Sequence, residues 1–360
     1  MGPRGVNQKS ARAARPARAA DVYTAAVAIP VGVLGAGSFG TCLAMLCAAN
    51  HDVRLWSRDA AIADGIRRDR RNPRYLSNVE LPASVEATPD LAHALADREL
   101  VICAVPSHGV RDVMSRAAPH LSREAILVST VKGIEVETCL RMDEVLREVL
   151  PAQHHARLVF LSGPSFASEV ANRRPTAVTV ACAEEAFAIS IQESISCPWF
   201  RCYSATDVVG VELAGALKNV IAIAVGVCDG LGLGENSRAA VMTRGLREIT
   251  RLGVRQGADP LTFLGLAGMG DLILTCTGDL SRNRRVGLLL AQGKSRDEIV
   301  SGMNEVAEGV RTTYAACALA ARHRVEMPIA HTVRAVLEGE IRAPEAIERI
   351  MSRQLRAENE

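Results

Sequence analysis

Residues 31–41, which read VGVLGAGSFGT, decide the fold of this 360-residue chain. A short apolar run leads into a G-x-G-x-x-G motif, and a helical pattern follows at 41–49. In this strand–turn–helix context Gly35 permits the tight turn, Gly37 lets a pyrophosphate approach the backbone, and Gly40 allows close helix–strand packing. Amide groups at the helix N-terminus then bind phosphate. The motif therefore predicts a dinucleotide site.

Outside this motif, short apolar runs alternate with helical stretches. The runs that we expect to form buried strands are 31–34, 53–56, 100–105, 126–131, 158–161, 177–181 and 200–203. Such alternation predicts a Rossmann-type α/β domain over 28–206, with a doubly wound, mostly parallel sheet. From Asp207, a candidate N-cap, the pattern is almost entirely helical. We expect an all-helical substrate-binding domain over 207–354.

Charge and composition exclude several classes of protein. Residues 1–27 carry a net charge of +4 and the rest of the chain −2, so the body is not a basic nucleic-acid-binding surface. We expect 1–27 to be a disordered extension, with a targeting segment as the alternative. No apolar run reaches the about 18 residues of a membrane span. The ten cysteines lack metal-site spacing, which predicts no metal and a reducing, cytoplasmic location.

The end of the second predicted strand bears on the choice of cofactor. An NAD site usually places Asp or Glu there to bond the ribose 2′-hydroxyl, whereas this chain has Ser57 followed by Arg58. The planar guanidinium of Arg58 suits a 2′-phosphate. The sequence favours NADPH/NADP, and the adjacent Asp59 leaves NADH/NAD open.

Lysine is rare here, since only four of the 42 basic residues are Lys. Arginine cannot deprotonate, so a retained Lys suggests a role that requires titration. Lys218 has no acidic neighbour three or four positions away on its helix, so we expect it to line a cleft, where burial lowers its pKa. Lys132 follows the fourth predicted strand; we expect a substrate role, with a structural ion pair as the alternative.

A glycine-rich stretch in the second half of the chain is a further candidate site. It runs over 265–271, continues through 275–278 and ends at 281–284. Glycines let the backbone approach a ligand, and Arg282 with Asn283 could clamp a phosphate. The alternative is a surface turn.

Taken together, these motifs resemble those of bacterial-type NAD(P)-dependent glycerol-3-phosphate dehydrogenases over about residues 30–352. The matching segments are GAGSFGTCLA, LPASVEATPDL, VPSHGVRDV, VKGIE, SGPSFASEVA, ELAGALKNVIAIAVGVCDGLGLGENSRAA, GLAGMGDLILTCTGDLSRNRRVG and EVAEGVRT. The resemblance implies interconversion of dihydroxyacetone phosphate and sn-glycerol 3-phosphate for glycerophospholipid synthesis. It is compatible with a homodimer.

The resemblance also implies roles for individual residues. Lys218 matches the proton donor and acceptor, and Lys132 matches a residue that touches both substrate and cofactor. The implied substrate contacts are Lys132, Gly163, Ser165, Lys218, Asp271, Ser281, Arg282 and Asn283. The implied cofactor contacts, beyond the three glycines, are Ser38, Phe39, Arg58, Lys132, Ala167, Arg282, Val306 and Glu308.

Three other functions remain open at this point. A related dehydrogenase of the 6-phosphogluconate type would need a carboxylate-binding cluster in place of the phosphate site. A non-catalytic NADP-binding sensor would not need Lys218. A dehydrogenase with Cys276 as nucleophile is disfavoured, because no base lies near it in the sequence.

Overall fold

The first domain is built on one eight-stranded sheet of order β3-β2-β1-β4-β5-β6-β7-β8. A computed structural model describes residues 28–303, 306–355 and 357–358, so the predicted extension 1–27 lies outside the described residues. The strands are β1 (Pro30–Leu34), β2 (Asp52–Trp56), β3 (Val85–Thr88), β4 (Leu100–Cys103), β5 (Ile126–Ser129), β6 (Leu158–Ser162), β7 (Thr176–Ala181) and β8 (Phe200–Ala205).

Neighbouring strands are parallel except β6 and β7, which pair antiparallel with Phe160 opposite Ala181. The predicted mostly parallel sheet is therefore confirmed. The edge strand β3 has no counterpart among the predicted strands. It is only four residues long and includes the exposed Glu86, so its sequence lacks the apolar run that marks the central strands.

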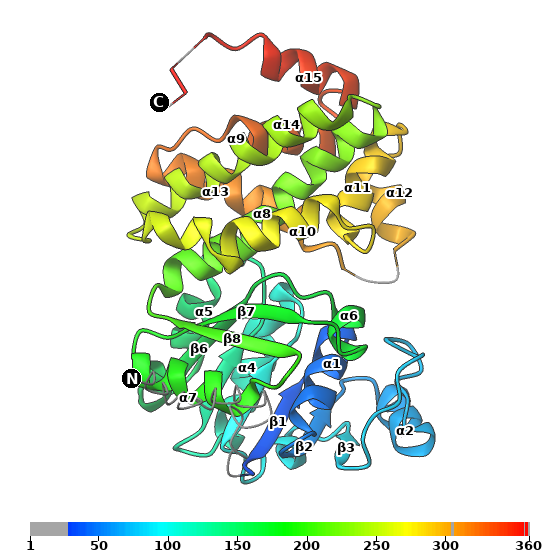
Figure 1. The fold of residues 1–360 in the computed structure, drawn as a ribbon, viewed down its shortest axis with the longest axis vertical. Helices are drawn as coiled ribbons and strands as arrows, with labels where there is room; N and C mark the ends of the chain where they lie inside the picture. The colour runs from blue at the N-terminus through cyan, green and yellow to red at the C-terminus, as the bar shows by residue number, and fades with distance from the viewer. Residues whose placement is uncertain (1–27, 304–305, 356, 359–360) are drawn as a thin grey trace, which may run out of the picture.

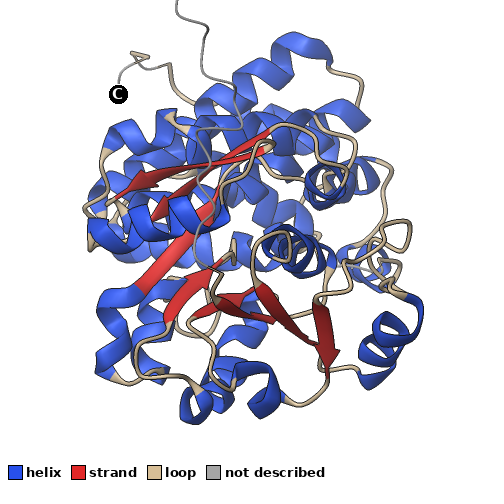
Figure 2. Cartoon of the chain, turned by 60° about the horizontal axis from the view of Figure 1, so that its bottom comes forward, coloured by secondary structure: helices blue, strands red, loops and turns tan. Residues whose placement is uncertain are grey.

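Helices cover both faces of this sheet, as Figure 2 shows. They are α1 (Ser38–Cys47), α2 (Ala60–Asp69), α3 (Leu91–Leu95), α4 (Val110–Ala117), α5 (Met142–Val149), α6 (Ala167–Ala171) and α7 (Glu185–Ile195). The central strands bury side chains on both faces, and two separate apolar clusters form there. This two-sided burial explains why the strands read as continuous apolar runs.

The second domain is helical and stacks on the sheet domain (Figure 1). Its helices are α8 (Val208–Gly230), α9 (Gly234–Arg255), α10 (Asp271–Thr277), α11 (Arg282–Ala291), α12 (Arg296–Ser301), α13 (Glu308–His323), α14 (Pro328–Leu337) and α15 (Ala343–Met351). The predicted N-cap is confirmed, because the Asp207 carboxylate accepts from the Gly210 amide at 2.9 Å. Helix α8 is long and apolar enough to cross a bilayer, yet 83% of its most apolar window is buried within the protein, so it is the core helix of this domain.

Helices α8 and α11 cross so closely that their backbones touch. A Cβ atom at Gly287 would lie 2.1 Å from the Ile223 carbonyl oxygen, and one at Gly226 would lie 2.1 Å from the Arg284 carbonyl oxygen. Neither site has room for a methyl group, since the obstructing atoms are backbone. The crossing brings the N-terminus of α11, with Asn283, against the middle of α8.

This crossing predicts the effect of one added methyl group. We expect Gly287→Ala to lower the free energy of unfolding by about 1–3 kcal/mol, because overpacking outweighs the helix propensity gained. Urea unfolding measures it. Gly109→Ala is the control, since Gly109 has φ −102° and a Cβ atom there meets nothing within 4 Å. Equal stability of the two variants would contradict the close crossing.

Candidate functional site

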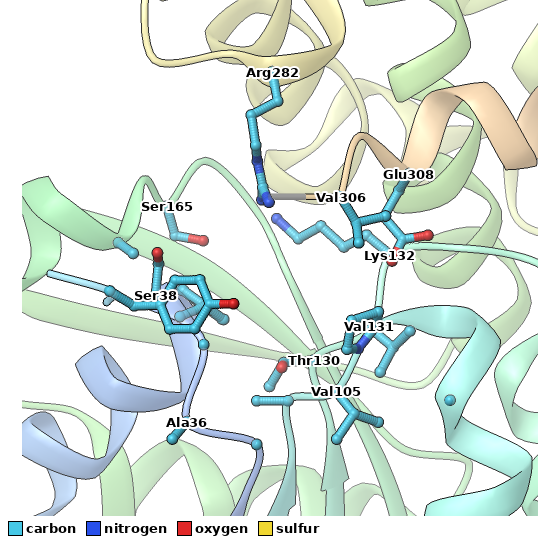
Figure 3. Close-up of a pocket in the computed structure, with 18 of the residues that line it drawn as sticks. Ala36, Ser38, Val105, Thr130, Val131, Lys132, Ser165, Arg282, Val306 and Glu308 are labelled. Carbon is cyan, nitrogen blue, oxygen red and sulfur yellow. The ribbon is translucent and has the colours of Figure 1, made fainter. Parts of the chain in front are cut away.

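A cleft of about 500 Å³ opens where the carboxyl ends of the strands face the helical domain. Ligands of open α/β sheets bind at this edge. The close-up in Figure 3 shows Ser38 and Val105 entering from the sheet domain, with Arg282 and Glu308 reaching in from the helical domain. Lys132 lies between the two sets.

The glycine turn forms one end of the cleft. Gly35 has φ +108°, and a Cβ atom at Gly40 would lie 1.8 Å from the Gly35 carbonyl oxygen, so both positions require glycine. A Cβ atom at Gly37 would meet nothing within 4 Å, so the fold itself does not demand glycine there. Gly37 lines the cleft and precedes α1, whose first turn has no acidic residue and no side-chain cap among the described residues. This cradle fits the pyrophosphate of a dinucleotide.

The side chains that follow β2 favour a cofactor with a 2′-phosphate over one with a free ribose 2′-hydroxyl. The Asp59 carboxylate accepts from the Ala61 amide at 3.0 Å and so caps α2. Arg58 is exposed in the cleft and bonds to no other described residue. At this strand end the Asp59 carboxylate is thus engaged by a helix, whereas the Arg58 guanidinium is available to a ligand.

Asn72 supports this end of the cleft from behind, a role the sequence does not reveal. It is fully buried, and its Nδ2 donates to the Ala36 carbonyl at 2.9 Å and to Thr41 Oγ1 at 2.8 Å. Its Oδ1 accepts from the amides of Arg74 and Tyr75. Asn72 therefore ties a second loop to the glycine turn. The Asn72-Pro73 pair indicates a turn, but not what that turn packs against.

One carboxylate holds both lysines at the other end of the cleft. Asp271 Oδ2 lies 2.7 Å from Lys132 Nζ, and Asp271 Oδ1 lies 3.0 Å from Lys218 Nζ. Lys132 also donates to the Gly163 carbonyl at 2.9 Å, and Lys218 donates to Thr275 Oγ1 at 2.6 Å. Lys218 has no acidic partner on its own helix, as the sequence shows, but it is paired with a carboxylate from another helix, α10. Lys132 does form an ion pair, and it lines the cleft as well.

Burial makes the Lys218 ammonium easier to deprotonate. The side chain is 6% exposed, and burial lowers its pKa from 10.5 to about 8, with the charge of Lys132 acting in the same direction and Asp271 opposing both. An amine with this pKa exchanges its proton near neutral pH. Burial raises the pKa of the Cys276 thiol to about 12, which disfavours the thiolate that a nucleophile needs.

Asparagines brace the lysine pair. Asn219 Nδ2 donates to the Lys132 carbonyl at 3.3 Å, and Asn219 Oδ1 accepts from Asn283 Nδ2 at 2.8 Å. Asn283 Oδ1 in turn accepts from the Gly309 amide at 2.9 Å. This series of hydrogen bonds links the sheet domain to three helices, α8, α11 and α13. Asn283 therefore serves as a brace as well as lining the cleft.

The Glu308 carboxylate closes the cleft across the two domains. It accepts from the Ser107 amide at 3.0 Å and from Ser107 Oγ at 2.6 Å. Ser107 lies in the loop after β4, within the VPSH segment. Neither Ser107 nor Thr275 was assigned a role from the sequence, since each acts through a residue distant in the chain.

The structure gathers the predicted site residues around one cavity. Those lining the cleft are Gly35, Gly37, Ser38, Phe39, Arg58, Lys132, Ser165, Ala167, Lys218, Asp271, Ser281, Arg282, Asn283, Val306 and Glu308. Gly40 and Gly163 lie behind its wall: Gly40 packs on Gly35, and Gly163 accepts from Lys132. Ser281 caps α11 through the Arg284 amide at 3.2 Å. The site roles of all these residues stay predictions.

Comparison with known proteins gives consistent matches over both domains. Residues 30–188 match the model of the NAD-dependent glycerol-3-phosphate dehydrogenase N-terminus, and residues 207–348 match that of its C-terminus. Proteins called glycerol-3-phosphate dehydrogenase [NAD(P)+] from Geobacter sp. (strain M21) and Myxococcus xanthus are 50% and 49% identical, over 91% of this chain and 98% of each relative. A crystal structure of glycerol-3-phosphate dehydrogenase from Coxiella burnetii superposes with TM-score 0.86 at 36% identity, covering 91% of this chain and 100% of that one.

The lowered pKa of Lys218 predicts a pH-dependent stability. Between about pH 8 and 10.5 the unfolded chain keeps a proton that the folded chain has lost, so the free energy of unfolding rises with pH, by up to about 1.4 kcal/mol per pH unit. Lys218→Met removes this rise. Urea unfolding at about pH 7.5 and about pH 9.5 measures the difference, with Lys294→Met at an exposed position as control. Parallel pH profiles for wild type and Lys218→Met would show that Lys218 titrates normally.

Proposed function

Because the chain belongs to the NAD-dependent glycerol-3-phosphate dehydrogenase family, we propose that its cleft transfers hydride between NAD(P)H and dihydroxyacetone phosphate, giving sn-glycerol 3-phosphate. The protein is an NAD(P)-dependent oxidoreductase that acts on a CH–OH group. One observation carries the proposal: Asp271 bridges Lys218 and Lys132 in the same cleft as the dinucleotide-binding turn.

The dinucleotide would be held at the glycine turn, where the α1 amides and Gly37 accommodate the pyrophosphate. Ser38, Phe39, Ala167, Val306 and Glu308 complete the cofactor part of the cleft. When bound, the cofactor supplies the hydride. Arg58 binds the 2′-phosphate of NADPH, and the adjacent Asp59, which also lines the cleft, leaves NADH possible.

The substrate phosphate binds at the other domain. Arg282 begins α11, so its guanidinium and the helix N-terminus present positive charge to the same part of the cleft. Ser165 and Ser281 also line the cleft. The phosphate contact orients the ketone toward the two lysines, and this placement lowers the barrier by restricting motion.

The two lysines have different roles at the ketone oxygen. Negative charge grows on this oxygen as the carbonyl carbon is reduced, and the Lys218 ammonium donates a proton to it. The Lys132 ammonium stabilises the same charge before the proton arrives. Asp271 keeps both Nζ atoms oriented. In the reverse direction neutral Lys218 accepts the proton from the hydroxyl group.

Cellular context belongs to the same proposal. The product is a precursor for glycerophospholipid synthesis. The ten cysteines are buried and unpaired, which supports a reducing compartment and hence a cytoplasmic location. A homodimer stays a prediction. Binding of nucleic acid is disfavoured by the net charge of −2 over the body of the chain.

Lys218→Arg tests proton transfer. We expect a loss of about 10²–10⁴ in kcat for NADPH oxidation with dihydroxyacetone phosphate, because arginine keeps its charge but does not release a proton. The Kd of NADPH, measured by its fluorescence, should stay within about twofold of the wild-type value, because arginine keeps the positive charge. Lys294→Arg is the matched control.

Two outcomes would overturn this assignment. Wild type that oxidises NADPH with other ketones but not with dihydroxyacetone phosphate would point to a related dehydrogenase, including the 6-phosphogluconate type. Full activity of Lys218→Arg would remove Lys218 from the chemistry.

Arg58→Glu tests the choice of cofactor. We expect the KM for NADPH to rise by about 10–100-fold, since a carboxylate repels the 2′-phosphate and removes a charged hydrogen bond, while NADH gains a partner for its 2′-hydroxyl. Initial rates with both cofactors measure the switch. Arg71→Glu, exposed on the neighbouring loop, is the control. An unchanged ratio of the two kcat/KM values would exclude Arg58 from the 2′-phosphate site.

A further inference from the structure

A second arginine lies at the end of the cleft that contains Arg58. Arg74 lines the cleft together with Arg58 and Asp59, and its side chain is exposed there. It belongs to the loop that follows α2, where the sequence does not single it out, because five of the eight residues 67–74 are arginine. The roles derived so far leave this guanidinium without a function.

The loop that carries Arg74 is fixed between the glycine turn and α2. Asn72 Nδ2 donates to the Ala36 carbonyl at 2.9 Å, and Asn72 Oδ1 accepts from the Arg74 amide at 3.1 Å. On the other side the loop packs on α2, since a Cβ atom at Gly65 would lie 2.8 Å from Pro73 Cγ. The backbone of Arg74 is therefore held beside the turn that fits the pyrophosphate.

The guanidinium of Arg74 is available to a ligand. Its Cζ lies 5.5 Å from the centre of the Tyr75 ring, and Tyr75 lines the cleft as well. This contact with the ring does not use the N–H donors of the guanidinium. Within the part of the chain that the structure describes, the Arg74 side chain forms no hydrogen bond or ion pair. Arg71, by contrast, lies 3.5 Å from Glu80 and does not line the cleft.

The charges at this end of the cleft give the second arginine a purpose. Asp59 follows Arg58 directly and also lines the cleft, so these two opposite charges largely cancel. The Asp59 carboxylate caps α2, and the cap orients this charge without removing it. A 2′-phosphate carries about two negative charges near neutral pH. Arg74 restores the net positive charge that such a group requires.

We propose that Arg74 is a second ligand of the 2′-phosphate of NADPH and that, with Arg58, it sets the preference for NADPH over NADH. This inference rests on the proposed function, because it assigns a further residue to the same cofactor. The two arginines flank α2, with Arg58 just before the helix and Arg74 in the loop after it. Each guanidinium presents parallel N–H groups to phosphate oxygens. NADH carries a neutral hydroxyl group at this position and gains little from the second charge.

Equilibrium binding of NADPH and of NADH to the full chain, followed by nucleotide fluorescence without any ketone, tests the proposal. We expect Arg74→Met to raise the Kd of NADPH by about tenfold or more and to change the Kd of NADH by less than about twofold. Arg74→Glu should raise the Kd of NADPH further, because a carboxylate repels the phosphate. Arg71→Met is the matched control, since Arg71 is exposed on the same loop outside the cleft, and it should leave both Kd values unchanged.

The double variant Arg58→Met/Arg74→Met tests whether the two arginines together set the preference. Wild type should bind NADPH more tightly than NADH. In the double variant only the Asp59 charge remains at this end among the described residues that carry these three charges. The Kd of NADPH should then be no lower than that of NADH. A double variant that still binds NADPH more tightly would place the 2′-phosphate elsewhere.

Two further results would contradict the proposal. An unchanged Kd of NADPH in Arg74→Met would remove Arg74 from the site. An equal rise of both Kd values would show that Arg74 contacts the adenosine common to both nucleotides or supports the loop. A failure of the proposed reaction is seen separately, because the titrations contain no ketone. Wild type that binds NADPH but does not reduce dihydroxyacetone phosphate would refute the reaction and leave the assignment of Arg74 standing.

Discussion

The carboxylate of Asp271 is the constraint on which the site depends. It joins Lys132, which follows β5 in the sheet domain, to Lys218, which lies in the core helix α8. Without this carboxylate the two ammonium groups, both largely buried, would repel each other without a counter-charge between them. Asp271 is held by a π-helical turn over Leu266–Gly270, where a Cβ atom at Gly268 would lie 2.2 Å from the Phe263 carbonyl oxygen. The glycine-rich stretch thus shapes backbone that positions a carboxylate.

The sheet domain could be predicted largely from local patterns. Buried parallel strands are continuous apolar runs, and the glycine turn has the G-x-G-x-x-G spacing, so both can be recognised in the sequence. What the sequence did not reveal depends on contacts between distant residues. The partner of Lys218 comes from α10, Glu308 meets Ser107 across the domains, and Asn72 reaches back to Ala36. Helical spacing around Lys218 describes only its own helix, so it could not show this partner.

Anionic ligands are attracted in this protein by a few locally placed positive groups and not by its net charge. The body carries a net −2, although both proposed ligands are anions. The positive potential comes from a few groups: the N-termini of α1 and α11, Arg58, Arg282 and the two lysines. Two acidic groups near them are engaged by other partners, since the Asp59 carboxylate caps α2 and the Asp271 carboxylate pairs with both lysines. Such an arrangement favours anions inside the cleft without making the whole surface attract polyanions.

The backbone contact between α8 and α11 has a consequence for the evolution of substrate range. Gly226 and Gly287 leave no side chain at the crossing that could be enlarged or trimmed, so the distance between Lys218 and the start of α11 is not easily tuned there. Leu274 and Leu280, by contrast, line the same cleft, and Leu280 is 55% exposed. Descendants of this scaffold that accept bulkier ketones would diverge first at this pair, while the glycine crossing is inherited unchanged.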